Sequence, residues 1–212
     1  MDPSTWGTYL VTQESHSPGR DTVSVVEEAL EHGIDAVQLR EKGMDARRRY
    51  RLGIRLRDLT DEAGVPLIVN DRIDLARAIA ADGVHLGQSD LPVEIARDQL
   101  DSDAVVGCSA ATVEEARTAE TAGADYLGVG AVYGTDSKDV DGEKNDVGPE
   151  RIRAIAEAVE LPIVGIGGID AGNAAAVVEA GAVGVAVISA ITTADDPAAA
   201  TRELREVVTD VR

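Results

Sequence analysis

The sequence has few aromatic residues, few lysines and a single cysteine. Its 212 residues include no Phe, one Trp and four Tyr, so Ala, Val, Ile and Leu must fill the core. The lone Cys108 excludes an internal disulfide framework and a cysteine-based zinc site. No apolar run approaches the roughly 20 residues that span a bilayer, and the first residues lack the pattern of a signal peptide. We therefore expect a cytoplasmic protein.

Negative charge dominates the composition. There are 39 acidic and 20 basic residues, a formal net charge of −19 and a pI of about 4.4. This charge repels phosphate, so we expect neither a nucleic-acid partner nor docking on an anionic membrane. Lysine supplies only three of the basic residues, namely Lys42, Lys138 and Lys144. An ordinary acidic protein is one interpretation, but we favour a halophilic protein, because repulsion between charges is screened within about 3 Å at 1 M salt.

Short apolar runs alternate with longer amphipathic segments along the whole chain. The apolar runs predict strands at residues 8–12, 36–39, 66–70, 83–86, 104–108, 126–129, 162–166 and 184–189. The amphipathic segments predict helices at residues 21–32, 45–63, 71–81, 92–100, 112–122, 149–159, 171–180 and 197–211. Glycines before every second strand indicate a repeat of two strand–helix units (Gly33, Gly83, Gly123 and Gly181). These patterns predict an α/β fold, a single (β/α)8 TIM barrel spanning residues 1–212, with a doubly wound open sheet as the alternative.

Chemistry in such a barrel takes place at the carboxyl ends of the strands. The second strand leads into Gln38, Arg40, Glu41 and Lys42. Alternation places Gln38 and Arg40 on one side, and two cations at the rim suit a phosphate or diphosphate. The alternative interpretation of these charges is a salt-bridged rim.

Carboxylates follow the next two strands. Asn70 and Asp71 follow the third strand, and Asp90 follows the fourth. Two converging carboxylates with room for water and substrate phosphate suit Mg²⁺. The alternative is that these side chains cap the helices that begin after them. In the pair beside Arg40 and Lys42, neither interpretation outweighs the other.

Small and hydroxyl-bearing residues follow the remaining strands. Ser109 could contact a ligand or cap a helix, whereas Cys108 is expected to be a small buried apolar residue. The long connection after the sixth strand is a candidate lid and contains Thr135, Ser137 and Lys138. Gly168, Ile188 and Ser189 follow the last two strands, where barrels often bind phosphate through backbone N–H groups. The residues thus predict two anion sites, for two phosphorylated substrates or one substrate with phosphates at both ends.

Six short motifs occur in order at these strand ends. They are Gln-Leu-Arg-Glu-Lys (38–42), Val-Asn-Asp (69–71), His-Leu-Gly-Gln-Ser-Asp (85–90), Gly-Cys-Ser-Ala (107–110), the run 128–138 and Gly-Ile-Gly-Gly-Ile (165–169). With these motifs the chain resembles the thiamine-phosphate synthases over nearly its whole length. The resemblance implies a transferase that joins hydroxymethylpyrimidine diphosphate to hydroxyethylthiazole phosphate, giving thiamine phosphate and diphosphate.

The resemblance also implies roles for individual residues. Mg²⁺ would be the cofactor, with Asp71 and Asp90 as its ligands. The catalytic groups would be Arg40, Lys42, Ser109 and Lys138. The pyrimidine substrate would be held by Gln38, Arg40, Glu41, Lys42, Asn70, Ser109 and Lys138. The thiazole phosphate would be held by Thr135, Ser137, Gly168, Ile188 and Ser189.

Other functions on the same fold remain as alternatives. A thiazole tautomerase-like isomerase would not need the metal and diphosphate set, and a barrel isomerase would need an acid–base pair that is not evident. A non-catalytic thiamine-precursor binding protein would not need the lysines and aspartates. The sequence leaves open whether the chain forms a homo-oligomer.

Overall fold

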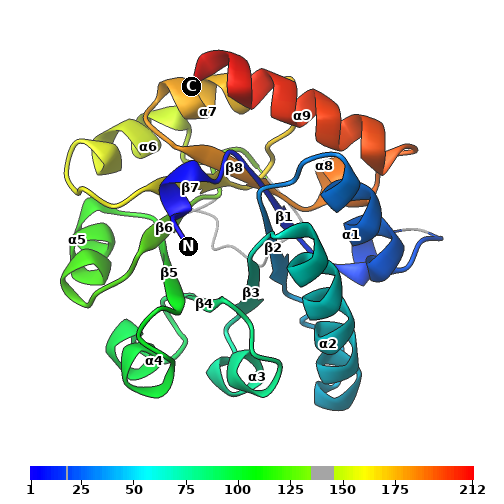
Figure 1. Ribbon diagram of the computed structural model, residues 1–212. Coiled ribbons are helices and arrows are strands. Elements are labelled where there is room, and N and C mark those ends of the chain that lie inside the picture. Colours follow the sequence, from blue (N-terminus) through cyan, green and yellow to red (C-terminus); the bar gives the residue numbers. More distant parts are fainter. Residues whose placement is uncertain (18, 135–145) are drawn as a thin grey trace.

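The strands form a closed parallel barrel. The computed structural model describes residues 1–17, 19–134 and 146–212. The strands are β1 (Thr8–Val11), β2 (Ala36–Leu39), β3 (Leu67–Asn70), β4 (Gly83–Leu86), β5 (Val105–Ala110), β6 (Tyr126–Val129), β7 (Ile163–Ile166) and β8 (Gly184–Val187). They pair in chain order, and β8 closes on β1 with Thr8 opposite Val185 (Figure 1). The predicted (β/α)8 barrel is confirmed, and the open-sheet alternative is wrong.

Helices surround the barrel (Figure 1). They are α1 (Thr22–Glu31), α2 (Ala46–Ala63), α3 (Ile73–Ala78), α4 (Val93–Gln99), α5 (Val113–Thr121), α6 (Pro149–Ala156), α7 (Ala174–Glu179), α8 (Ser189–Thr192) and α9 (Pro197–Val211), with 3-10 turns η1 (Pro3–Thr5) and η2 (Glu14–His16). In the described part of the chain, four α-helices begin at a side chain that accepts a hydrogen bond from the first turn, at Asp21, Asp45, Thr112 and Asp196. Within the described ranges, no helix is both long and apolar enough to cross a membrane.

The predicted boundaries differ from the structure at several places. The last strand ends at Val187, and Ser189 begins the short helix α8, which the sequence pattern missed. Strand β5 extends to Ala110, so Ser109 lies within the strand and not after it. Both errors arise at strand ends, where a small residue fits a strand, a turn or a helix start equally well.

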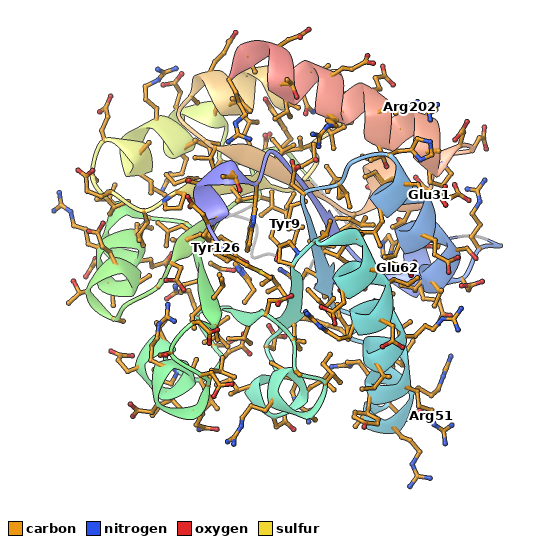
Figure 2. The ribbon with its side chains drawn as sticks, in the orientation of Figure 1. Tyr9, Glu31, Arg51, Glu62, Tyr126 and Arg202 are labelled. Atoms are coloured by element: carbon orange, nitrogen blue, oxygen red, sulfur yellow. The ribbon has the colours of Figure 1, made fainter. Side chains whose placement is uncertain are left out.

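Side chains alternate between the inside of the barrel and the layer of helices. On β1, Tyr9 and Val11 pack inside the barrel, whereas Leu10 packs against the helices. On β5, Cys108 is 6% exposed and belongs to the outer layer, as predicted for a small apolar residue. Figure 2 shows Tyr9 and Tyr126 near the centre of the barrel. The inward positions near the carboxyl ends are therefore the ones available to a ligand.

Three aspartates tie the amino-terminal ends of the strands together. Asp82 precedes β4, and its Oδ2 accepts a hydrogen bond of 2.8 Å from the Leu67 amide at the start of β3. Asp35 and Asp125 make the equivalent bonds to β1 and β5. Each carboxylate is also paired with an arginine from the surrounding helices, as Asp82 is with Arg57 of α2. The pattern occurs before β2, β4 and β6 but not before β8, where Val183 takes the place of the aspartate, so the predicted internal repeat holds at three of its four positions.

The predicted glycine repeat holds at three of its four positions. Gly33, Gly123 and Gly181 have φ angles of 89°, 91° and 111°, in the left-handed region that favours glycine. Gly83 is an exception because it lies within β4, where an added Cβ would come within 2.0 Å of the Val105 carbonyl oxygen. Close approach of the neighbouring strand explains this glycine.

Candidate active site

A cavity opens at the carboxyl ends of β2 to β5. Its volume is about 150 Å³. It is lined by Arg40, Lys42, Asn70, Asp71, His85, Gly87, Ser89, Asp90 and Ser109. These residues are distant in sequence, and the barrel brings them to one end. This one site therefore contains the predicted residues Arg40, Lys42, Asn70, Asp71, Asp90 and Ser109, but neither Gln38 nor Glu41 lines it.

Lys42 and Asp71 form an ion pair across the cavity. The Lys42 Nζ lies 3.2 Å from Asp71 Oδ2. The Lys42 side chain is 57% exposed and the Asp71 side chain 25% exposed, so the cation lies at the rim and the carboxylate lies deeper. Asp71 has a φ angle of 63°, and its backbone amide donates a 2.8 Å hydrogen bond to the His85 carbonyl. This bond joins the end of β3 to β4 and fixes the turn that carries the carboxylate.

Asp90 lies beside Asp71. Its Oδ2 accepts a 2.7 Å hydrogen bond from the Gly87 amide, which closes the turn after β4. Burial raises the pKa of Asp90 above its usual range; the bond from Gly87 acts in the opposite direction, and the neighbouring Asp71 carboxyl raises the pKa further. The Asp71 carboxyl is thus close enough to oppose the ionisation of Asp90.

The helix-capping interpretation of these residues is wrong. Helix α3 begins after Arg72 and helix α4 after Pro92, and neither helix has a side-chain cap. Asp71 and Asp90 are therefore available to a ligand rather than committed to a helix end.

Two adjacent carboxylates are a partial ligand set for a cation. Within the described residues, no group of three or more His, Cys, Asp or Glu side chains could hold a metal ion. Mg²⁺ commonly uses one or two carboxylates and takes its other ligands from water and substrate phosphate. The oxygen-only pair of Asp71 and Asp90 fits such an ion, and a divalent cation would relieve the repulsion between them.

The β2 residues divide into two groups. Gln38 and Arg40 are buried, with 3% and 6% of their surface exposed. The Arg40 guanidinium donates to the Gln13 side chain and also lines the cavity. Glu41 does not line the cavity, because its carboxylate accepts bonds from the Glu14 amide at 2.8 Å and the Thr22 hydroxyl at 3.0 Å. The structure therefore gives Glu41 a place in the support of the site and does not bring it to the predicted substrate.

Sequence reasoning missed the role of three residues inside the barrel. His85 Nε2 lies 3.0 Å from Ser109 Oγ, and His85 Nδ1 lies 2.9 Å from the Tyr126 hydroxyl. The Tyr126 hydroxyl in turn lies 3.1 Å from that of Tyr9. His85 lies two residues after Gly83 on β4. Because this four-residue strand is buried on both faces, its sequence shows no alternation of polar and apolar residues that would indicate which way His85 points.

The second predicted anion site lies at β7 and β8. Gly167 and Gly168 have φ angles of 104° and 61°. At Gly168 an added Cβ would come within 2.8 Å of the Tyr133 side chain and of the Gly134 carbonyl, so only glycine fits there. Ile188 and Ser189 are located at the start of α8. The predicted residues Thr135, Ser137 and Lys138 lie outside the described residues.

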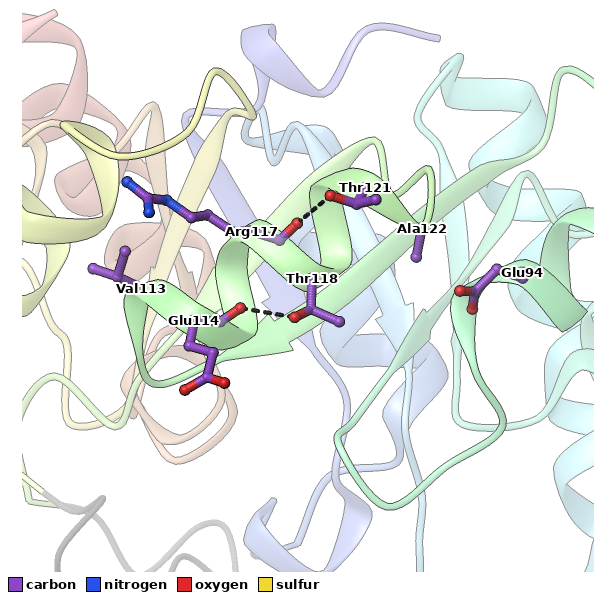
Figure 3. A pocket seen from close by; sticks show the side chains of 7 residues that line it. All are labelled: Glu94, Val113, Glu114, Arg117, Thr118, Thr121 and Ala122. Atoms are coloured by element: carbon purple, nitrogen blue, oxygen red, sulfur yellow. Dashed lines mark hydrogen bonds between the residues drawn. The ribbon is translucent and has the colours of Figure 1, made fainter.

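A larger groove lies on the outside of the barrel. It has a volume of about 610 Å³ and is lined by Glu94, Val113, Glu114, Arg117, Thr118, Thr121 and Ala122 (Figure 3). The side-chain hydroxyls of Thr118 and Thr121 bond to carbonyl groups of their own helix. The groove contains none of the predicted site residues, so its size does not make it the active site.

Comparisons with known proteins identify the family. A family model described as thiamine monophosphate synthase matches residues 8–191. Thiamine-phosphate synthases from Natronomonas pharaonis and Haloarcula marismortui are 63% and 64% identical over 206 and 204 residues, which cover 97% and 96% of this chain and 96% and 97% of theirs.

A solved structure agrees with these relatives. The thiamine phosphate pyrophosphorylase from Pyrococcus furiosus superposes with a TM-score of 0.89 at 41% identity, over 98% of both chains. The two sequence relatives belong to halophilic archaea, in agreement with the acidic composition. The chain therefore belongs to the thiamine-phosphate synthase family, transferases of thiamine biosynthesis.

Proposed function

We propose that the chain joins hydroxymethylpyrimidine diphosphate to hydroxyethylthiazole phosphate. The bond between the pyrimidine methylene carbon and the diphosphate oxygen breaks, and its electron pair leaves with the diphosphate. The lone pair of the thiazole nitrogen then forms the new carbon–nitrogen bond, giving thiamine phosphate and diphosphate. The observation that carries this proposal is the cavity where Arg40, Lys42, Asp71 and Asp90 meet at the carboxyl end of the barrel.

The cations of the cavity would stabilise the leaving diphosphate. Arg40 is 6% exposed, so its interaction with a phosphate is weakly screened by water. Lys42 lies at the rim, where its ammonium group can move from Asp71 toward a phosphate oxygen. Negative charge grows on the diphosphate as the bond breaks, and groups already in place favour that transition state over the bound substrate. Lys138 is proposed as a further cation in this role.

Asp71 and Asp90 would hold Mg²⁺, which when bound offsets the charge on the diphosphate. Neither aspartate would act as a nucleophile or a base in this reaction. The thiazole nitrogen is itself the nucleophile, and it needs no deprotonation. Asn70 lines the same cavity and is 6% exposed, so its amide would orient the diphosphate. Ser109 and Gln38 would contact the pyrimidine ring.

The thiazole phosphate would bind at the loops after β7 and β8. The left-handed turn at Gly167 and Gly168 supports this role, because it leaves backbone without side chains at the barrel mouth. Ile188 and Ser189 would supply the other edge, and Thr135 and Ser137 are proposed to contact the same phosphate. Holding both substrates at one barrel end would replace a bimolecular encounter by an oriented one.

Two other functions are weaker candidates. A thiazole tautomerase-like isomerase would have no use for the ion pair of Lys42 and Asp71 beside Asp90. A non-catalytic precursor-binding protein would have little reason to bury Arg40 at a cavity of like-charged carboxyl groups. We further propose that the protein works in a cytoplasm of high salt, since its composition and its halophilic relatives support that environment.

The test is an assay of the full chain in concentrated KCl with Mg²⁺. Both substrates are supplied together, then each is omitted in turn, and the products are identified by mass spectrometry. The expected result is thiamine phosphate and diphosphate in equal amounts, only when both substrates are present. Folded protein that yields no thiamine phosphate across a wide range of salt would overturn the proposal, and conversion of the thiazole phosphate alone would favour the isomerase.

A further inference from the structure

Three of the five aromatic residues of this chain, Trp6, Tyr9 and Tyr126, gather inside the barrel. The Trp6 ring lies 5.6 Å from the Tyr9 ring and 5.2 Å from the Tyr126 ring, measured between centroids. Both tyrosines are 1% exposed, and they lie near the barrel centre in Figure 2. Burying a hydroxyl is costly unless it is hydrogen-bonded. Phenylalanine would fill the same space without that cost, so the two hydroxyl groups call for an explanation.

The hydroxyls belong to a hydrogen-bonded chain that runs from β2 to β5. Gln38 Nε2 donates to the Tyr9 hydroxyl at 2.9 Å. The Tyr9 and Tyr126 hydroxyls are 3.1 Å apart, and Tyr126 lies 2.9 Å from His85 Nδ1. His85 Nε2 lies 3.0 Å from Ser109 Oγ. The chain therefore connects two residues of the proposed pyrimidine site through three side chains in the barrel interior.

The first donor favours one direction for the later bonds. An amide nitrogen can only donate, so the Tyr9 oxygen accepts from Gln38. Either tyrosine hydroxyl could donate to the other, and donation from Tyr9 to Tyr126 is the arrangement that also gives the Tyr9 hydrogen an acceptor. The Tyr126 hydrogen then goes to His85 Nδ1. Burial raises the pKa of both tyrosines, so both phenols keep their hydrogens. An accepting Nδ1 leaves the imidazole hydrogen on Nε2, which donates to Ser109.

We propose that Tyr9, Tyr126 and His85 are positioning residues that make the Ser109 hydroxyl a hydrogen-bond donor to the pyrimidine substrate. Ser109 Oγ accepts from His85, so its own hydrogen points to an acceptor in the cavity, and a pyrimidine ring nitrogen is such an acceptor. This inference rests on the proposed function for the substrate, but the direction of the chain does not. At the other end Gln38 Oε1 is buried and has no partner among the described residues, so it remains an acceptor.

The neighbouring strands leave space for the two rings. An added Cβ at Gly107 of β5 would come within 2.2 Å of the Tyr126 ring, and one at Gly128 of β6 within 2.8 Å of His85 Cε1. Both positions point into the barrel, where other strands carry side chains. The absence of side chains at Gly107 and Gly128 lets Tyr126 and His85 reach each other, so the arrangement depends on four positions and not on one contact.

The first test reads the imidazole directly and needs no substrate. The full chain is labelled with ¹⁵N-histidine, and His85 is assigned among the three histidines by comparison with His85→Gln. At neutral pH we expect the nitrogen shifts and proton couplings of the neutral Nε2–H form. In Tyr126→Phe we expect a mixture of Nδ1–H and Nε2–H forms. A hydrogen on Nδ1 in the unsubstituted protein would overturn the proposal, whatever the protein's activity.

The second test separates positioning from general support of the fold. Tyr126→Phe keeps the ring and removes one hydroxyl, so we expect the KM for the pyrimidine diphosphate to rise about tenfold. The KM for the thiazole phosphate should stay within about twofold of its original value. Gly128→Ala displaces His85 without removing any hydrogen-bonding group. It should likewise raise the KM for the pyrimidine diphosphate and leave the KM for the thiazole phosphate nearly unchanged.

The matched control is Tyr50→Phe, because Tyr50 lies on α2 and is 43% exposed. It should change neither KM nor the His85 signals. Equal rises in both KM values for Tyr126→Phe and Gly128→Ala would contradict positioning, and so would no change in either. A chain that makes no thiamine phosphate at all would refute the proposed function while leaving the tautomer measurement to decide the hydrogen-bonded chain.

Discussion

Lys42 Nζ lies 3.2 Å from Asp71 Oδ2, so the cation at the end of β2 neutralises the carboxylate at the end of β3. Asp90 is the third group of this cluster, and the like charge of Asp71 helps to raise its pKa. Among the described residues, the site thus places two cations, Arg40 and Lys42, beside two carboxyl groups before any ligand binds. A divalent cation with a diphosphate would satisfy both carboxylates and release Lys42 to the phosphate.

Replacing Asp71 tests its proposed role as a metal ligand. Asp71→Ala should lower turnover with Mg²⁺ by about 100-fold or more, because charge stabilisation by a bound metal is worth several kcal/mol. The control is Asp74→Ala, an exposed aspartate three residues away that is paired with Arg72. Steady-state rates should fall for Asp71→Ala alone, with the thermal unfolding midpoints of both variants reported beside them. Full activity in Asp71→Ala would remove Asp71 from the metal site.

The two partners of Arg57 should differ in their effect on stability. Asp82 is 14% exposed and also accepts from the Leu67 amide, whereas Asp61 is 56% exposed. Asp82→Ala should lower the free energy of unfolding by about 3 kcal/mol, because it leaves the Leu67 amide without its acceptor and removes the less exposed of the two carboxylates that pair with Arg57. Asp61→Ala should cost about 0–1 kcal/mol. Equal losses of unfolding free energy in urea titrations of the two variants would refute the claim that Asp82 stabilises the start of β3.

The thiol of Cys108 should be unreactive in the folded protein. Burial raises the pKa of Cys108 to about 11, and the negative charges of Glu115 and Asp90 act in the same direction. The thiolate is the reactive form, so alkylation should be slow at pH 8 and should accelerate only as the pH approaches about 11. Rates of iodoacetamide labelling against pH measure this, with the urea-unfolded chain as control. Folded protein that reacts at pH 8 as fast as unfolded protein would show an exposed thiol.

Adding a methyl group at Gly168 tests the second anion site. Gly168→Ala places a Cβ within 2.8 Å of Tyr133 on a backbone with a φ angle of 61°, so the turn must shift. We expect the KM for thiazole phosphate to rise about tenfold while the KM for the pyrimidine diphosphate changes little. Gly172→Ala is the control, since Gly172 has an ordinary φ angle and its nearest neighbour is the Asp170 side chain at 3.2 Å. A change confined to the pyrimidine substrate would contradict the assignment of the two sites.

The fold and the diphosphate residues were predictable from the sequence for a physical reason. Parallel strands that are buried on both faces appear as apolar runs, and barrel topology brings whatever follows them to one end. Arg40, Lys42, Asp71 and Asp90 were therefore found from their position in the chain alone. Helix α9 begins and ends where the pattern placed it, since Asp196 and Pro197 mark its start.

The remaining features depend on where each side chain points and which residue it reaches. The position of a residue in the sequence does not show this. Glu41 lies between two site residues, yet a φ angle of 28° turns its carboxylate back to Glu14 and Thr22. His85 and Tyr126 act through bonds between strands 41 residues apart, which no local pattern reveals. Helix α8 has four residues and is too short for a helical period to emerge.

We propose that departure of the diphosphate depends on a metal held at the carboxyl ends of β3 and β4. The most direct measurement is thiamine phosphate formation by the unsubstituted chain in concentrated KCl, with Mg²⁺, with excess chelator, and after Mg²⁺ is added back. We predict product with Mg²⁺, loss of at least about 100-fold with chelator, and recovery on addition. Thiamine phosphate formed at the same rate in chelator would show that departure of the diphosphate needs no metal.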